Sequence, residues 1–595
     1  MQVTVVASGP AAESAAAAVG DWDATVTVVE ADTGDVDDAV LADADAGVVV
    51  GPVGDERFRT ANRMLDRWIA VEFGGIGGRA FSDTAGSVAA FDRESGCYDC
   101  LRRRVTAATA ESEQTTAGGV ADESSGGNET REGASEGRGD AGDALERSER
   151  RYAGALAGRR TVRLLSGESL GGTAVELDGR ERRFTRAPGC DCHERPTGFE
   201  RDYRAVSLDA AVGRMERLVD DRVGPITEVG ERESFPLPYY VARTADTTAF
   251  SDVRCGQFGG GAAVDWNEAY AKSVGEALER YCAGVYRTGT LRHAPTEGVL
   301  DAVPVERFVR PDDAPAVAGE RLAWVDGVSL ADGSYAALPA AFVGFPPPRE
   351  LAPPITTGLG AGSSVDEALL SGLCEVIERD ATMLAWYSTF EPMEVVVETD
   401  RFDALCKRAR AEGLSVTPTL CTQDVDVPVV GCAVHREGAW PQFAAGSAAA
   451  LDAREAAADA LAEALQNWTE LRGMGPERAA REGGAIGRYA DFPAEARAFV
   501  DTDTRLPADG IGERLPPDRA VDAVVERLTD AGLTPYAARL TTSDAADVGF
   551  EVVRVLVPEA QPLFTGEPYF GDRLGEVPPQ MGFEPRPDRA YHPYP

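Results

Sequence analysis

The sequence predicts an α/β protein with two folded domains, and three observations lead to this expectation. Its 595 residues are about four times the roughly 150-residue length of a typical domain. Near the start, short apolar runs such as VTVVAS, TVTVVEA and AGVVVG alternate with helix-capable stretches. The same alternation returns later, where YYVART, AAFVGF, VVGCAVH and EVVRVLVP have the pattern of strands between strong helical segments.

Composition divides the chain into four segments. Residues 1–104 carry the first α/β pattern, whereas residues 105–150 are acidic, rich in Gly and Ser and almost without apolar side chains. That composition predicts a disordered linker. Residues 151–204 resume a short α/β pattern, which we interpret as the second part of the first domain. Residues 205–595 then form one large α/β domain.

The charge balance excludes two classes of partner. The chain carries 99 acidic and 59 basic residues, a formal net charge of −40 at pH 7. Nucleic acids and anionic membranes both require a cationic face, so neither is an expected partner. The opening MQVTVVASGP lacks the basic start of a signal peptide, and no stretch is apolar enough to span a membrane. We therefore expect a cytoplasmic protein whose ten cysteines are thiols or metal ligands.

One pattern occurs three times in the large domain. Its copies are EAYAKSVGEALER from Glu268, EALLSGLCEVIER from Glu367 and EAAADALAEALQN from Glu455. Each copy is rich in Ala, Leu and Glu, which predicts a helix. At 100° per residue, offsets of eight and eleven fall within about 80° of the first position, on one side of the helix. The three predicted faces are Glu268, Glu276 and Glu279; Glu367, Glu375 and Glu378; and Glu455, Glu463 and Gln466.

Converging carboxylates predict a cation site. On a single helix, a solvated acidic face is the ordinary interpretation. Three copies with the same spacing favour a shared function, because carboxylates brought together repel one another unless cations neutralise them. Mg²⁺ takes oxygen ligands and completes its shell with water and substrate phosphates, so the pattern predicts a magnesium and nucleotide site.

Several features bear on phosphate binding. Arg280 and Arg379 follow the last glutamate of the first two copies, and Lys272, one of two lysines, lies in the first. All three are placed to meet phosphate oxygens. The glycine-rich GQFGGG and GLGAG precede the first two helices, and we interpret them as turns whose amides approach phosphate. No P-loop motif occurs in the sequence. The segment GESLG around Ser169 matches the nucleophile elbow of hydrolases, but it lacks a leading strand and a histidine partner. The segment GGIGG from Gly74 is not a dinucleotide-binding fingerprint.

Two cysteine pairs predict a zinc site. Cys97 and Cys100 form C-x-x-C, and Cys190 and Cys192 form C-x-C. Four thiolates in two chelating pairs satisfy tetrahedral Zn²⁺, which would join both parts of the first domain. Unligated thiols and a redox pair are the alternatives.

Together these features resemble the YcaO family. The resemblance rests on SVGEALERY, SSVDEALLSGLCEVIERDA, the EAAADALAEALQ segment, VVRVLVPEAQPLF and the terminal HPYP, and it spans about residues 205–595. The segments GCYDCLRRR and GCDCH are similar to the zinc-bearing, Rossmann-like ThiF-like region that is fused to azoline-forming members. The many acidic residues and few lysines resemble proteins of salt-loving archaea, which suggests haloarchaeal homologues.

The resemblance implies an enzyme that uses ATP and Mg²⁺ to activate a peptide amide oxygen. A Cys, Ser or Thr of a ribosomal precursor peptide would attack the preceding carbonyl, and the phosphorylated oxygen would leave to give an azoline. Peptide thioamidation at the same nucleotide site and a non-catalytic peptide-binding scaffold are the alternative functions. The expected partners are the precursor peptide, a separate leader-binding protein or flavin oxidase, and a second copy in a homodimer.

The resemblance also assigns residues. Glu375, Glu378 and Pro595 are the expected catalytic residues. Magnesium is expected on Glu276, Glu279, Glu375 and Glu378, and structural zinc on the four paired cysteines. The expected ATP-binding residues are Ser273, Glu276, Glu279, Arg280, Glu367, Glu375, Glu378, Arg379, Glu463 and Gln466.

Overall fold

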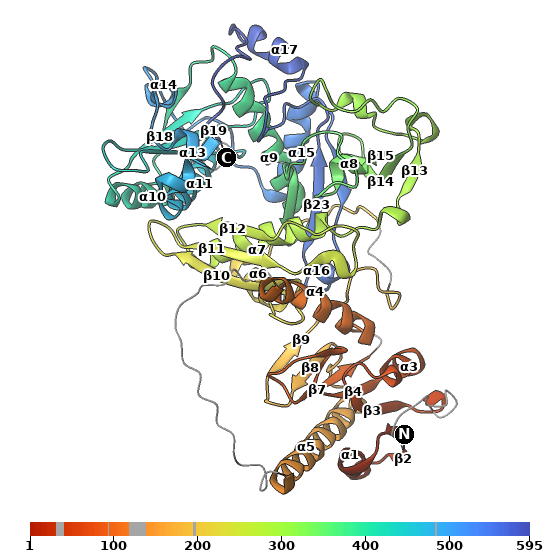
Figure 1. Cartoon of the computed structure of the whole chain (residues 1–595). Helices are drawn as coiled ribbons and strands as arrows, with labels where there is room; N and C mark the ends of the chain where they lie inside the picture. Colours follow the sequence, from red (N-terminus) through yellow and green to blue (C-terminus); the bar gives the residue numbers. More distant parts are fainter. Residues whose placement is uncertain (31–40, 93, 118–138, 194–197, 482–484, 595) are drawn as a thin grey trace. The chain divides into compact units, whose positions relative to one another are not determined.

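The chain folds into two compact units (Figure 1). A computed structural model describes every residue except 31–40, 93, 118–138, 194–197, 482–484 and 595. Both units are mixed α/β structures, as the sequence predicts. The amino-terminal unit comprises Met1–Arg195, Arg217–Thr227 and Thr248–Phe250, and the carboxy-terminal unit comprises Pro196–Glu216, Glu228–Thr247 and Ser251–Pro595. No helix in the described part of the chain is long and apolar enough to cross a membrane.

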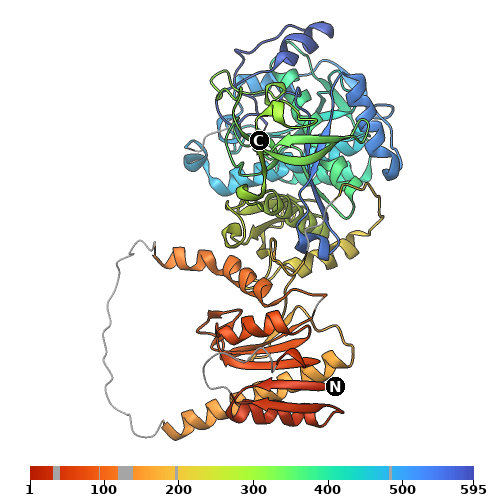
Figure 2. The ribbon, with the colours of Figure 1, turned by 90° about the vertical axis from the view of Figure 1, so that its right-hand side faces the viewer.

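A seven-stranded sheet organises the amino-terminal unit (Figure 2). Its order is β2-β1-β3-β4-β7-β8-β9; the first four strands are parallel, and each of the last three is antiparallel to the strand before it. The strands are β1 (Gln2–Val6), β2 (Thr25–Val29), β3 (Ala46–Pro52), β4 (Trp68–Phe73), β7 (Gly86–Phe91), β8 (Thr173–Glu176) and β9 (Glu181–Arg183). The GGIGG segment contains β5 (Gly75–Ile76) and the turn of a hairpin whose second strand is β6 (Arg79–Ala80).

Helices cover both faces of this sheet. Val48 and Val50 lie in one apolar core with residues of α1 and α5, and Val49 lies in a second core with residues of α3 and α4. Successive strand residues point to opposite faces, so a continuous apolar run is what a sheet buried on both sides requires. The helices are α1 (Gly9–Gly20), α3 (Glu56–Met64), α4 (Tyr98–Ala117) and α5 (Gly139–Leu165).

The predicted disordered linker over residues 105–150 is too wide. Helix α4 continues to Ala117 and helix α5 begins at Gly139, so the expectation is wrong for both ends of the segment. Leu101 and Val105 anchor α4 in the core, and a helix nucleated by packing extends into polar sequence more easily than it would form there alone. The middle of the predicted linker, residues 118–138, lies outside the described residues.

Three sheets organise the carboxy-terminal unit. Their orders are β10-β11-β12, then β13-β14-β22-β23-β16 with β15 paired to β14, and β20-β19-β18-β17-β21. The strands are β10 (Ile226–Glu233), β11 (Tyr239–Thr244), β12 (Phe258–Ala262), β13 (Arg292–Ala294), β14 (Leu322–Ser329), β15 (Tyr335–Pro339), β16 (Leu359–Gly362), β17 (Met393–Val396), β18 (Ser415–Leu420), β19 (Val429–His435), β20 (Phe443–Ala449), β21 (Arg505–Pro507), β22 (Tyr536–Arg539) and β23 (Glu551–Leu556).

The three repeats form the helices that the sequence predicts: α7 (Trp266–Ala283), α9 (Val365–Trp386) and α11 (Ala453–Met474). Each follows a strand at the end of its own sheet, namely β12, β16 and β20. A side chain caps each helix by accepting backbone N–H bonds: Asp265, Ser364 and Asp452. The other helices are α6 (Leu208–Met215), α8 (Ala340–Val343), α10 (Asp400–Ala411), α12 (Pro476–Ala479), α13 (Ala485–Tyr489), α14 (Ala494–Val500), α15 (Pro517–Asp530), α16 (Ser543–Asp547) and α17 (Asp572–Gln580).

Glycines in these three strands bring each repeat helix close to its strand. A Cβ added at Gly259, Gly360 or Gly446 would lie 2.3, 2.1 or 2.5 Å from the backbone of the helix that follows. The sequence predicts that GQFGGG and GLGAG form phosphate-binding turns. In the structure these stretches instead form most of strand β12 and all of strand β16. Their glycines serve close packing of helix on strand.

Candidate functional site

The acidic faces of α7, α9 and α11 line one cavity of about 1050 Å³, which we call the carboxylate cavity. Eight carboxylates and four basic side chains lie among its lining residues. Eight of the ten residues expected to bind nucleotide are among them: Glu276, Glu279, Arg280, Glu367, Glu375, Glu378, Arg379 and Glu463. The structure thus brings together side chains that are up to 187 positions apart in the sequence.

The second acid of each repeat is held by the strand preceding its own helix. Glu276 accepts a hydrogen bond from the backbone N–H of Gly260 at 2.5 Å, and Glu463 accepts one from Ser447 at 2.6 Å. Glu375 accepts the N–H of Gly358, just before β16, at 2.9 Å. In each repeat the donor lies 16 or 17 residues before the glutamate, so the same contact forms three times.

The third position of each repeat reaches the strand of the next one. Glu279 accepts the backbone N–H of Ala361 in β16 at 2.8 Å, and Glu378 accepts the hydroxyl of Ser447 in β20 at 2.7 Å. Gln466, the third position of the third repeat, lies beside β12 of the first unit. Its Nε2 would be 3.3 Å from a Cβ added to Gly260. The three strand–helix units therefore form a closed ring, in which each helix contacts the strand of the next unit.

Burial makes the ionised form of these acids costly. It raises the pKa of Glu276, Glu279 and Glu463, and it raises the pKa of Glu378 to about 8. Repulsion from Glu375 and Glu276 raises the pKa of Glu279 further. An all-oxygen donor set of this kind fits hard divalent cations, which favour the ionised carboxylates.

Basic side chains offset part of this negative charge. Arg280 Nη2 lies 2.5 Å from a carboxylate oxygen of Glu276. Arg379 lies between two acids, with nitrogens 3.5 Å from Glu378 and 4.0 Å from Glu463. The guanidinium groups and the carboxylates share one cavity, so a phosphate held by a cation there would also have donors beside it.

Two further residues were not predicted as part of the site. Glu470 accepts hydrogen bonds from Tyr239 Oη at 2.8 Å and from Gln466 Nε2 at 3.2 Å, and its charge raises the pKa of Glu276. It lies four residues after Gln466, so helical periodicity could have identified it. Arg554 is 4 % exposed. A basic residue within the apolar stretch EVVRVLVP could have indicated a buried charge with a function.

Three expected site residues are not found in the lining of the cavity. Ser273 is fully buried and its hydroxyl donates to the carbonyl of Tyr270 in α7, so it is not among the residues that line the cavity. Gln466 is also absent from the lining and instead lies beside β12. Pro595 lies outside the described residues.

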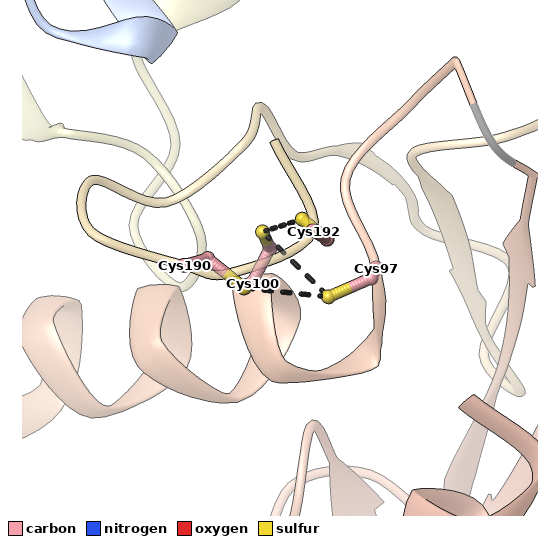
Figure 3. Close-up of side chains that lie close together, drawn as sticks. All are labelled: Cys97, Cys100, Cys190 and Cys192. Atoms are coloured by element: carbon pink, nitrogen blue, oxygen red, sulfur yellow. Dashed lines mark hydrogen bonds between the residues drawn. The ribbon is translucent and has the colours of Figure 1, made fainter. Parts of the chain in front are cut away.

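Four cysteines form a second cluster in the amino-terminal unit (Figure 3). Cys97 precedes α4 and Cys100 lies in its first turn, while Cys190 and Cys192 lie in the loop after β9. The sulfur–sulfur distances are 3.9 Å for Cys97–Cys100 and 3.5 Å for Cys97–Cys190 and Cys100–Cys192. All four sulfurs lie within 4.8 Å of one another.

This geometry fits one tetrahedral metal ion. Zn–S bonds of about 2.3 Å place the sulfurs of a tetrahedral site about 3.8 Å apart, close to the distances found here. All four cysteines are free thiols, so the cluster holds no disulfide. A thiolate set with this geometry suits Zn²⁺, whereas the carboxylate cavity suits harder cations.

Comparisons with known proteins place the fold in a family. An uncharacterised protein of Methanothermobacter thermautotrophicus is 27% identical over 372 residues, covering 59% of this chain and 91% of the relative. The solved structure of a heterocyclase in complex with substrate and cofactor covers 98% of this chain and 83% of its own, with 18% identity and a TM-score of 0.70. The structure of the heterocyclase TruD covers 98% and 82%, with 19% identity and a TM-score of 0.62.

The decisive match is to a family model described as YcaO cyclodehydratase, ATP- and Mg²⁺-binding. It covers residues 260–561, which is more than half of the chain and includes all three repeat helices. The two heterocyclase structures share the α/β fold over nearly the whole chain. The chain therefore belongs to the YcaO family.

Proposed function

We propose that this protein uses ATP and Mg²⁺ to activate a backbone amide of a precursor peptide, and that it forms azolines by cyclodehydration. The observation that carries the proposal is the ring of carboxylates, held by backbone donors from three sheets around one cavity. Membership in a family described as ATP- and Mg²⁺-binding cyclodehydratases supports it.

The carboxylates and arginines have separate roles in this proposal. Glu276, Glu279, Glu375 and Glu378 hold Mg²⁺, which neutralises the triphosphate of ATP. Both Arg280 and Arg379 line the carboxylate cavity. In this proposal they donate to phosphate oxygens, and the charge of Arg379 also stabilises the phosphoryl group during transfer. Phosphoryl transfer requires positioning and charge neutralisation more than covalent assistance, and this cavity supplies both.

The proposed reaction balances as a dehydration. The thiol or hydroxyl of a Cys, Ser or Thr loses its proton to solvent as it adds to the preceding carbonyl carbon, and the resulting oxyanion attacks the γ-phosphorus of ATP. ADP leaves, the phosphorylated oxygen then departs as phosphate, and the amide nitrogen loses its proton as the C=N bond forms. Each azoline lowers the peptide mass by about 18 Da, one water. Thioamidation would instead raise it by about 16 Da, so the mass distinguishes the two products.

The amino-terminal unit is proposed to be ThiF-like and to serve peptide recognition, with zinc on its four cysteines as a structural ion. The closed thiolate set leaves no ligand position for a substrate, which is the usual property of structural zinc. Recognition of the precursor could also involve a separate protein, and a flavin oxidase could act on the azoline afterwards.

Mg·ATP binding by calorimetry tests the proposal. We expect Glu375→Gln and Glu378→Gln each to weaken binding about 100-fold, because each removes a charge that faces the cation. Glu526→Gln changes an exposed helical glutamate on α15 and is the matched control with no expected effect. The measurement belongs in multimolar KCl, since a chain of net charge −40 repels itself at low salt. Equal binding by all four proteins would reject the site.

A further inference from the structure

A second cavity adjoins the site and differs from it in chemistry. Its volume is about 80 Å³, and its lining is mostly apolar or aromatic, including Phe308, Phe342, Ile355, Ala560 and Tyr569. We call it the apolar cavity. Among the described residues that line it, the only charged side chains are Arg379 and Arg554.

The two cavities share one guanidinium group. Arg379 lines both of them. On α9, Glu375 and Glu378 line the carboxylate cavity, while Val376 faces the apolar one. A group bound in the apolar cavity would therefore lie next to the side chain that approaches the phosphoryl group in the proposed reaction.

Arg554 builds the wall between the cavities. Its two terminal nitrogens donate to the carbonyls of Ile355 and Thr356, each at 2.9 Å. Thr356 lines the carboxylate cavity, whereas Ile355 and Thr357 line the apolar one. Among the described residues, the buried Nε of Arg554 has no hydrogen-bond partner, so it can donate to a backbone carbonyl oxygen of a bound substrate.

The remaining lining is aromatic or has its polar groups already paired. Phe308 and Phe342 stack with ring centroids 4.0 Å apart and planes 3° from parallel. The amide of Gln561 is occupied by contacts with Pro562, Tyr569 and Gly571. Pro353 is exposed, so the lining runs from the surface to the buried arginines.

Size and charge decide what fits. A water-sized atom needs about 10–15 Å³ of such volume, so the cavity holds about five to eight non-hydrogen atoms. That is the size of a phenylalanine side chain, which has seven such atoms; the four of leucine also fit, and a nucleoside does not. Two guanidinium groups disfavour a cationic occupant, and the apolar walls favour an uncharged one.

We propose that the apolar cavity binds the apolar side chain of the substrate residue that precedes the modified Cys, Ser or Thr. The inference rests on the proposed function, because the carbonyl to be activated is one bond from the Cα that carries this side chain. With that side chain in the apolar cavity, the carbonyl oxygen faces Arg379 at the junction of the two cavities. Phe308 and Ala352 then determine which residues are accepted.

Small amides test the cavity directly. Ligand-observed NMR compares N-acetyl-leucine amide and N-acetyl-phenylalanine amide with the glycine and lysine amides, with and without Mg·ATP. Burial of one such side chain predicts affinities about ten- to 100-fold higher for the two apolar amides. Equal binding of leucine and glycine amides would overturn the proposal, as would preference for lysine.

Variants locate the binding. We expect Ala352→Phe, which fills the cavity, and Phe308→Ala, which removes a wall, each to weaken leucine amide binding about tenfold or more. Phe583→Ala removes another half-buried ring, paired with Phe390 at 5.1 Å, and is the matched control. Unchanged leucine amide binding in Ala352→Phe would reject the cavity. Mg·ATP binding is measured separately on every protein, so a failure of the nucleotide site is distinguished from a failure of this inference.

Discussion

The cysteine cluster and the carboxylate cavity both bring together side chains of types that bind cations, yet they are built in opposite ways. The four sulfurs lie within 4.8 Å of one another, whereas the acids are spread around about 1050 Å³. A tight set of four soft ligands closes the coordination shell of one ion. An open set of hard ligands leaves positions for water and substrate. A closed set suits an ion that would hold the fold, whereas an open set suits an ion that would serve a reaction.

The two regions also differ in how the chain supports them. The cysteines come from the start of one helix and one loop of the amino-terminal unit. The glutamates come from three helices, and their backbone donors lie in, or just before, strands of three different sheets. The cluster therefore depends on local geometry, while the cavity depends on the packing of the whole carboxy-terminal unit.

Loss of one cysteine is the largest effect that we predict. Cys100→Ser removes a fully buried ligand, so zinc content should fall from one ion per chain to near none. Structural zinc contributes about 10–16 kcal/mol in small zinc modules. A unit with its own core should lose less, about 3–5 kcal/mol, which lowers its unfolding temperature by about 10 °C or more.

Metal analysis and calorimetry check this prediction. Cys406→Ser changes a buried thiol of α10 in the other unit and should leave zinc content unchanged. Mg·ATP binding should persist in Cys100→Ser if the two regions are independent. Full zinc retention by Cys100→Ser would show that the cluster is not a four-thiolate site.

A glycine substitution should disturb the cavity without touching an acid. A Cβ on Gly360 would lie 2.1 Å from the carbonyl oxygen of Ala368, so Gly360→Ala pushes α9 away from β16. We expect a loss of about 1–3 kcal/mol in unfolding free energy. We also expect weaker Mg·ATP binding, since the neighbouring Ala361 positions Glu279.

Gly275→Ala is the matched control for that substitution. Nothing lies within 4 Å of a Cβ at this position in α7, so alanine should stabilise the helix by about 0.5–1 kcal/mol. Chemical denaturation of both variants measures the two free energies. Equal effects from the two substitutions would mean that close packing of strand and helix is not what positions the acids.

The helices of the site follow from sequence, whereas the strands beneath them do not. The eight- and eleven-residue offsets put the acids of α7, α9 and α11 on one side, which the structure shows. The strands β12 and β16 look like turns because glycine is unfavourable in isolated strands. Only the approach of the following helix explains those glycines, and that contact is tertiary.

The same limit applies to individual residues. Helical periodicity could have predicted the position of Glu470, because it lies four residues after Gln466. The position of Gln466 beside β12 is different, because it depends on the ring closing between the third repeat and the first. Arg554 and the apolar cavity depend on strand pairing between β16 and β23, which no local pattern encodes.

The carboxy-terminal segment gives the smallest effect near neutral pH, and it tests whether the cavity depends on distant parts of its unit. His592 is 1% exposed, and its Nε2 lies 2.9 Å from the carbonyl oxygen of Phe564. Its backbone N–H donates to Tyr387 Oη at 3.2 Å. Burial lowers the pKa of His592 to about 4. The neighbouring Tyr594 is buried too, and the charge of Glu378 helps to raise its pKa, so the segment lies near the cavity.

The sign of the pH dependence follows from that lowered pKa. Between pH 6.5 and about 4 the unfolded chain binds a proton on this histidine and the folded chain does not, so stability falls as the pH falls. The loss is about 1 kcal/mol at pH 5.5 and about 3 kcal/mol below pH 4. Unfolding free energies of the parent and His592→Gln, measured across this range, should converge as the pH falls. Parallel curves would show that His592 does not contribute to the pH dependence of stability. Convergence accompanied by weaker Mg·ATP binding near pH 4 in the parent alone, where the folded histidine begins to bind its proton, would show that the carboxylate cavity relies on a segment remote in sequence.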